Sequence, residues 1–353
     1  MGPRHKLVLA VLGISALGTC AYRCTASSTP APARWTADDL PPVPSDNGWQ
    51  TLQDTFSNGA MTPEIPDATR DAIAMLGNVS ARESWASITP LRLELERFVQ
   101  SPEGSRAIAR WAHGTEATAF ADACPMNMSV RCHHFDMFRL HRVALAEALW
   151  HAVRGDEDAA LQRAAVMIRH QAQYLRSARG PMSARVSAAM LLASLGLAAV
   201  LQLRVAQGAE VSAQTQESLV TALESIDVDA AILQNIVIGS YLYTRDALAQ
   251  VNSANGAAVL GDDTFWPPHW LYDEAHATAR FNTAYETVME LARDPSTALP
   301  EAPEPTWTDR VLHPVTTTLL MVLDPRTLLA GQVVAMRDEF SEIQSARMAL
   351  LGN

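Results

Sequence analysis

The sequence has 353 residues and a single lysine, Lys6, which lies in the extreme N-terminal segment. Chemistry that needs a lysine inside the folded body is therefore excluded, including Schiff-base catalysis and the phosphate-binding lysines of P-loop proteins and kinases. The sequence also has no GxGxxG, HExxH, CxxC or GxSxG motif. These absences remove the common dinucleotide, zinc-protease, redox and hydrolase signatures. We expect no cofactor, and we favour a protein that is not an enzyme.

Basic residues are few compared with acidic ones. The chain has 27 Lys and Arg against 38 Asp and Glu, which gives a net charge of −11. A general nucleic-acid binder would need the opposite balance, because its affinity depends on neutralising phosphates. Hydrophobic residues make up 48% of the chain, and a chain of this length can bury a substantial core. Nucleic acid is therefore excluded as a partner, and so is disorder throughout.

The N-terminal segment is typical of a bacterial export signal. Arg4 and Lys6 precede an uncharged apolar run over residues 7–22, which matches the charged and apolar regions of such signals. Three fates are open for residues 1–25: a retained membrane helix, a lipid anchor attached to Cys20, or cleavage. The Pro-rich spacer over 26–45 favours a retained anchor, because a stiff spacer is useful behind one. We expect the inner membrane to hold residues 7–22 and the rest of the chain to lie in the periplasm.

A second uncharged run covers residues 186–203 and is long enough to cross a membrane. It is rich in alanine and contains serine, glycine and glutamine, so its insertion into lipid would be weakly favourable. We therefore predict a central helix that is buried on all sides. A second membrane span is the alternative.

The remaining sequence predicts an all-α fold, because helical periodicity recurs and no segment shows sustained alternation. We expect one domain over 46–353, built as an irregular bundle or short solenoid of antiparallel helical hairpins. Asp46 and Asp67 are the predicted N-caps of two short helices. The other predicted helices cover 90–99, 102–120, 133–154, 156–178, 181–207, 212–225, 227–252, 271–293, 309–323 and 325–351.

Arginine is concentrated in one part of the chain. Residues 159–209 contain six arginines and no acidic residue. Arg169, Arg176 and Arg179 fall on one face of a helix at 100° per residue. Such a face suits anionic lipid head groups or an acidic partner. The simpler interpretation is a solvated face, or ion pairing with the acidic C-terminal third of the chain.

The densest group of metal-ligating residue types surrounds two cysteines. Cys124 and Cys132 flank a short loop and are followed directly by two histidines. In an oxidising compartment this spacing predicts a disulfide that closes the loop. The alternative is a site for a soft ion such as Cu(I), which sulfur ligands favour. The residues available to that site are Cys124, Met126, Met128, Cys132, His133 and His134.

A second polar group precedes and opens a late helix. Asp273, His276 and Arg280 are spaced i, i+3 and i+7, so a carboxylate and an imidazole share a helical face, as a general base would require. The structural interpretation is that Asp273 lies at a helix N-terminus, where acidic residues are favoured. The aromatic residues just before it are buried loop anchors in that interpretation, and a docking site if exposed. They are Trp266, Trp270 and Tyr272.

Several short motifs together resemble those of a group of membrane-anchored helical proteins of Gram-negative bacteria. They are Asp46-Asn47-Gly48-Trp49, the Cys124 and Cys132 pair, the Gly155-Asp156 hairpin, and the stretch from Tyr272 to Tyr285. The group has no assigned activity. The resemblance therefore implies an N-terminal anchor and a helical fold, but no reaction.

Taken together, the sequence predicts a membrane-anchored periplasmic helical protein that acts by binding another envelope protein. Two alternatives remain open. One is an envelope hydrolase that uses Asp273 and His276. The other is a copper-binding protein that uses Cys124, Cys132 and the two histidines that follow.

Overall fold

The computed structural model describes residues 31–127, 129–251, 272–294, 296–298, 301–307, 310 and 313–352. Within these ranges every named element is helical, and one isolated β-bridge joins Asn47 to Ala119. The predicted all-α class is therefore confirmed. The predicted anchor at residues 7–22, with Cys20, lies outside the described residues.

The chain groups into two compact units where the sequence led us to expect one domain. The larger unit comprises Leu40–Pro125, Arg131–Ile236 and Ala335–Asn353, and the smaller unit comprises Met1–Asp39, Met126–Val130 and Val237–Val334. Two long helices, α11 (Ala230–Gln250) and α16 (Pro325–Leu351), contribute residues to both units.

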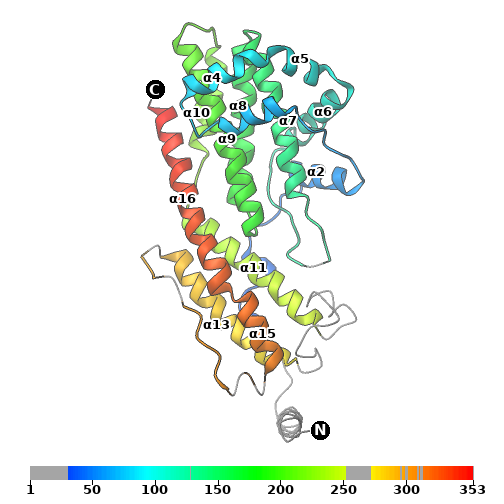
Figure 1. Cartoon of the computed structure of the whole chain (residues 1–353), viewed down its shortest axis with the longest axis vertical. Helices are drawn as coiled ribbons and strands as arrows, with labels where there is room; N and C mark the ends of the chain where they lie inside the picture. Colours follow the sequence, from blue (N-terminus) through cyan, green and yellow to red (C-terminus); the bar gives the residue numbers. More distant parts are fainter. Residues whose placement is uncertain are drawn as a thin grey trace, which may run out of the picture. The chain divides into compact units, whose positions relative to one another are not determined.

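The larger unit begins with short helices (Figure 1): α2 (Gly48–Ser57), α3 (Asp67–Met75), α4 (Ala81–Ile88), α5 (Arg92–Gln100) and α6 (Pro102–Thr115). Asn47, and not the predicted Asp46, caps α2 by accepting a hydrogen bond from the backbone of Trp49. The sequence analysis did not identify α4, although Ser80 and Glu83 form a capping box at its start. The predicted helix over 102–120 ends at Thr115, and residues 116–120 continue as an irregular segment.

Longer helices follow: α7 (His134–Val153), α8 (Glu157–Arg176), α9 (Pro181–Ala206) and α10 (Ala213–Glu224). Gly155 ends the first hairpin turn with a φ of +86°, and the side chain of Asp156 caps α8 by accepting from the backbone of Ala159. Pro181 occupies the first turn of α9. Helices α7, α8 and α9 pack against one another (Figure 1), so short connections force neighbouring helices together.

Helix α9 forms much of the core of the larger unit. Its length and composition are sufficient for a membrane span, but a core helix of a soluble protein would also meet those criteria, and 67% of its apolar window is buried inside the structure. Leu191, Leu195, Leu197 and Leu201 are each at most 1% exposed. The prediction that this helix is buried on all sides is not met, because a stripe that includes Leu192 stays half-buried.

The smaller unit contains α13 (Glu274–Arg293) and α15 (Pro314–Leu323) together with parts of α11 and α16. The hydroxyl of Tyr285 donates to the carbonyl of Ser240, and its ring packs edge-on against Tyr241. The described end of the predicted spacer also packs here. Arg34 donates from its backbone to Tyr241 and pairs with Glu286 at 2.9 Å. The spacer is therefore not free along its whole length.

Candidate functional site

The cysteine loop is closed as predicted. Cys124 and Cys132 form a disulfide, and their Cα atoms lie 5.9 Å apart. Asp122, just before the loop, is 1% exposed. One of its carboxylate oxygens accepts a hydrogen bond from the backbone N–H of Cys124 at 2.9 Å, and the other accepts from the backbone N–H of Arg179 at 3.0 Å. Asp122 therefore connects the segment just before the disulfide loop to the turn between α8 and α9.

The histidines after the loop have structural partners. Nδ1 of His133 lies 2.8 Å from the carboxylate of Asp136, and Nδ1 of His134 lies 2.6 Å from the hydroxyl of Tyr174. Burial raises the pKa of Tyr174, and burial lowers the pKa of His134. Both groups are therefore held neutral, as a packed aromatic contact requires.

The residues around this disulfide are those of the copper site that the sequence offered as an alternative. The sulfurs of Cys124 and Cys132 and one nitrogen of His134 lie within 4.8 Å of one another. The disulfide uses both thiols, so thiolate ligands would become available only after its reduction. Met126 is half-buried in the loop, and Met128 lies outside the described residues. With the disulfide formed, the two cysteines close the loop covalently and supply no thiolate ligand to a metal.

The predicted basic face is divided between different contacts. Arg169 is exposed on α8. Arg176 donates to the carbonyl of Ser225 at 3.1 Å and lies 3.9 Å from Asp227, an acid of the C-terminal third. Arg179 donates to the carbonyl of Pro41 at 2.8 Å. Two of the three arginines therefore have intramolecular contacts, Arg176 with a carboxylate and a carbonyl and Arg179 with a carbonyl near the start of the unit.

Asp273 and His276 at the start of α13 do not form the side-chain pair that a general base would require. Oδ1 of Asp273 accepts from the backbone N–H of His276 at 3.0 Å and so caps the helix. Oδ2 of Asp273 lies 3.6 Å from Nδ1 of His313, and the rings of His276 and His313 stack at 3.6 Å. Asp273 is thus directed at His313, a residue that the sequence pattern did not identify.

A small cavity of 180 Å³ lies beside this histidine pair, within the smaller unit. His276 and Arg280 line it, together with the ion pair of Asp324 and Arg326. The nearby Tyr272 is 1% exposed and therefore cannot be a docking residue on the surface. Trp266 and Trp270 lie outside the described residues.

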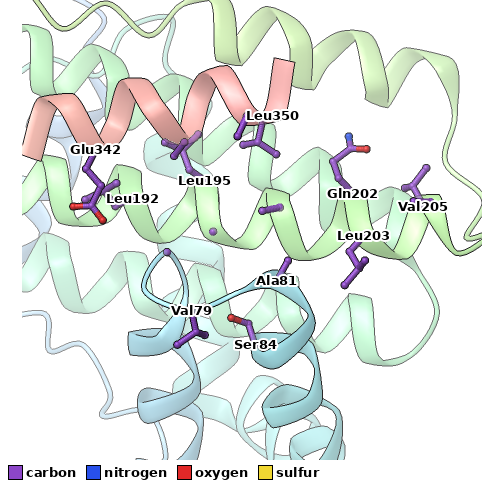
Figure 2. A pocket seen from close by; sticks show the side chains of 16 residues that line it. Val79, Ala81, Ser84, Leu192, Leu195, Gln202, Leu203, Val205, Glu342 and Leu350 are labelled. Carbon is purple, nitrogen blue, oxygen red and sulfur yellow. The ribbon is translucent and has the colours of Figure 1, made fainter. Parts of the chain in front are cut away.

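Another cavity follows the half-buried stripe of α9. It has a volume of 680 Å³, and its walls come from the start of α4 with the turn before it, from α9, and from the last turns of α16, all in the larger unit. Figure 2 shows Leu192, Leu195 and Leu203 of α9 with Leu350 of α16 around it. Apart from Glu342, the described lining residues are uncharged.

A second cavity, of 490 Å³, lies next to the first and shares Gly77, Leu192 and Glu342 with it. Its lining includes His141 from α7, which is fully buried. The sequence analysis did not predict either cavity. The only local signals were the small residues Gly77 and Gly196, where the turn after α3 meets α9. A Cβ on Gly196 would collide with the backbone nitrogen of Gly77.

Comparisons with known proteins find no relative from which a role for these sites could be transferred: no protein-family model, no curated protein and no solved structure matches the chain. The resemblance noted in the sequence stays a prediction. The functional argument therefore depends on the cavities and on the side chains that line them.

Proposed function

We propose that this protein is a non-catalytic envelope protein, held at the inner membrane by residues 7–22, whose periplasmic body of helical hairpins binds a partner protein. The observation that carries the proposal is the 680 Å³ cavity along α9. A helix apolar enough to cross a membrane presents its half-buried stripe to this cavity. Open apolar surface of this kind on a folded protein marks an interaction site.

The lining indicates the chemistry of the partner segment. Most of the described lining residues are small or aliphatic, including Ala199, Leu203 and Ala346, so hydrogen-bonding groups are few. The rim is also apolar, because Val79 is 38% exposed. Helices commonly dock by laying an apolar face into such a groove. Because Glu342 supplies a carboxylate and the whole chain carries a charge of −11, we expect an apolar helix flanked by basic residues.

Site-specific photo-crosslinking in cells tests this proposal. A photoreactive amino acid placed at Val79 or at Leu203 of the full chain should crosslink to a protein, and mass spectrometry should map the crosslink to an apolar helical segment. Leu93 on α5 is the matched control, because it is an apolar residue with 64% exposure that does not line the cavity. A reporter fused after residue 353 should be active only outside the cytoplasm.

A blocking variant makes the crosslinking result specific. Ala199→Trp fills the cavity with a large side chain, and it should abolish crosslinking from Leu203 while the protein keeps its helical circular dichroism spectrum. Equal crosslinking from Leu93, labelling of lipid alone, or full crosslinking in Ala199→Trp would each contradict the proposal.

A further inference from the structure

The second cavity of the larger unit has a different character from the groove along α9. Its 490 Å³ is within the range of about 300–1,000 Å³ that small-molecule sites occupy. Ile73, Leu76 and Leu145 form an apolar floor and are each at most 4% exposed. Arg142 and Arg185 supply positive charge, whereas Glu339 and Glu342 of α16 supply negative charge.

His141 lines this cavity and has one buried nitrogen without a hydrogen-bond partner among the described residues. Its imidazole is fully buried, and its Nε2 lies 3.1 Å from the carbonyl oxygen of Met190 and 3.2 Å from the hydroxyl of Ser194. A carbonyl can only accept, so Nε2 carries the proton and Nδ1 is left as an acceptor. Within the described part of the chain, Nδ1 has no hydrogen-bond partner. A buried polar atom of this kind is costly unless something donates to it.

The protonation of His141 agrees with this assignment. Burial is the main cause that lowers the pKa of His141 to about 3. The ring is therefore neutral at neutral pH, and Nδ1 remains an acceptor under those conditions. A ligand that satisfies this atom must present an N–H or O–H group at the floor of the cavity.

The charged groups form no close ion pair among the described residues, although burial raises the pKa of Glu339 and the charge of Arg185 acts against that rise. No ion pair within 4.0 Å joins Arg142 or Arg185 to a carboxylate there, although Arg142 lies over the ring of Phe138 at 4.2 Å. Glu339 is half-buried, and Glu342 is exposed. Two cations and two anions around one apolar cavity are complementary to a ligand that carries both charges.

We propose that this cavity binds a free aromatic amino acid whose side chain ends in a hydrogen-bond donor, as in tryptophan or tyrosine. The α-carboxylate pairs with Arg142 and Arg185, and the α-ammonium pairs with Glu339 and Glu342. The aromatic ring lies on the apolar floor, and its N–H or O–H donates to Nδ1 of His141. This small-molecule site is additional to the protein-binding groove of the proposed function.

Arginine suits the first of these roles because its planar guanidinium can bind a carboxylate with two parallel hydrogen bonds. The ring supplies most of the buried apolar area, and the polar groups fix its orientation. Each polar group that lines the cavity and lacks a close partner thus has a counterpart on one ligand. A purely anionic lipid would place its negative head group near the negative carboxylate of Glu339, so it matches the lining less well.

Isothermal titration calorimetry of the full chain in lipid nanodiscs, with L-tryptophan as the probe, tests the proposal directly. We expect saturable binding to one site per chain. L-3-Benzothienylalanine has nearly the same shape but replaces the indole N–H with sulfur, so it should bind about tenfold more weakly because His141 stays unsatisfied. Indole and N-acetyl-L-tryptophanamide, which lack the two charges, should show no saturable binding.

Variants test the role of the two arginines, whereas the ligand series tests the role of His141. Arg142→Gln with Arg185→Gln should weaken L-tryptophan binding by about tenfold, since the half-buried Arg142 and the exposed Arg185 would both lose a charge-assisted contact with the carboxylate. Arg169→Gln is the matched control, because Arg169 is an exposed arginine that does not line the cavity, and its affinity should be unchanged.

Three results would overturn the inference: no saturable binding of L-tryptophan, equal affinity for L-3-benzothienylalanine, or equal affinity for N-acetyl-L-tryptophanamide. The two proposals fail separately. Loss of photo-crosslinking at Leu203 with L-tryptophan binding retained would contradict only the proposed protein-binding groove. Absence of L-tryptophan binding with crosslinking retained would contradict only the small-molecule site.

Discussion

Two histidines of the larger unit are buried as neutral groups, and this affects the stability of the fold. His141 is 0% exposed and His170 is 1% exposed. Burial is the first cause in both cases and lowers the pKa of His141 to about 3 and that of His170 to about 4, compared with 6.5 for a free histidine. The unfolded chain therefore binds protons at pH values where the folded chain does not.

This difference predicts a pH dependence of unfolding. The free energy of unfolding is highest above pH 6.5, where both histidines are neutral in the folded and the unfolded chain. It decreases as the pH falls from 6.5 toward the pKa of each histidine in the folded chain, because only the unfolded chain binds the proton there. Between pH 7 and pH 5 the free energy of unfolding should fall by about 2 kcal/mol for each of the two histidines. Urea titrations at the two pH values measure the change.

Single variants divide the effect between residues. His170→Leu should remove about 2 kcal/mol of the fall between pH 7 and pH 5, because it deletes one of the titrating histidines. His113→Gln is the control, since the side chain of His113 is 71% exposed. An unchanged pH dependence in His170→Leu would disprove the assignment.

At the scale of helices, the sequence predicted boundaries where the caps are local. Helices α8, α9 and α16 begin and end within two residues of their predicted limits, because Asp156, Pro181 and Pro325 define their starts. Helix α4 was missed because the sequence analysis assigned no start signal to Ser80 and Glu83, although the two form a capping box. The interruption at Thr89–Leu91 is a 3-10 turn that the pattern of apolar residues does not reveal.

The packing of these helices depends on one close approach that the sequence could not predict. Gly196 of α9 lies against the turn after α3, where an added Cβ would collide with the backbone nitrogen of Gly77 and lie 2.8 Å from the carbonyl carbon of Leu76. Backbone atoms on the facing segment cannot move aside as a flexible side chain would. A glycine in the middle of a helix is normally unfavourable, so its value here comes from tertiary contact.

Two glycine substitutions should therefore have opposite effects. Gly196→Ala should lower the free energy of unfolding by about 1–3 kcal/mol, because the added methyl group overpacks the contact. Gly331→Ala in α16 should raise it by about 0.5–1 kcal/mol, because nothing lies within 4 Å of the added atom and alanine favours a helix. Chemical denaturation compares the two, and a loss of the same size in both would contradict the packing argument.

At the scale of the whole molecule, the sequence predicted the class of the fold and the disulfide but not the cavities. The fold class follows from periodicity, and the disulfide follows from the spacing of Cys124 and Cys132. The cavities are built from four segments far apart in the chain, around residues 73–84, 138–145, 185–206 and 339–350. Local patterns do not specify which helices meet, so Arg142, Arg185 and Glu339 could not be grouped in advance.

The disulfide should contribute measurably to the stability of the whole chain. Closing a loop with a sequence separation of 8 residues restricts the unfolded chain and contributes about 2–3 kcal/mol in the chain-entropy estimate. Adding a reductant should therefore lower the urea midpoint of the purified protein. The double variant Cys124→Ser with Cys132→Ser should already have the lower midpoint and should not respond to reductant. A native protein that is indifferent to reductant would contradict this.

The same covalent clip has a consequence for limited proteolysis. Arg131 is exposed between the two cysteines, and with Lys6 as the sole lysine trypsin can cut the body only after arginine. A nick after Arg131 would split the backbone but leave both fragments joined through sulfur, so they would migrate as one species until reduced.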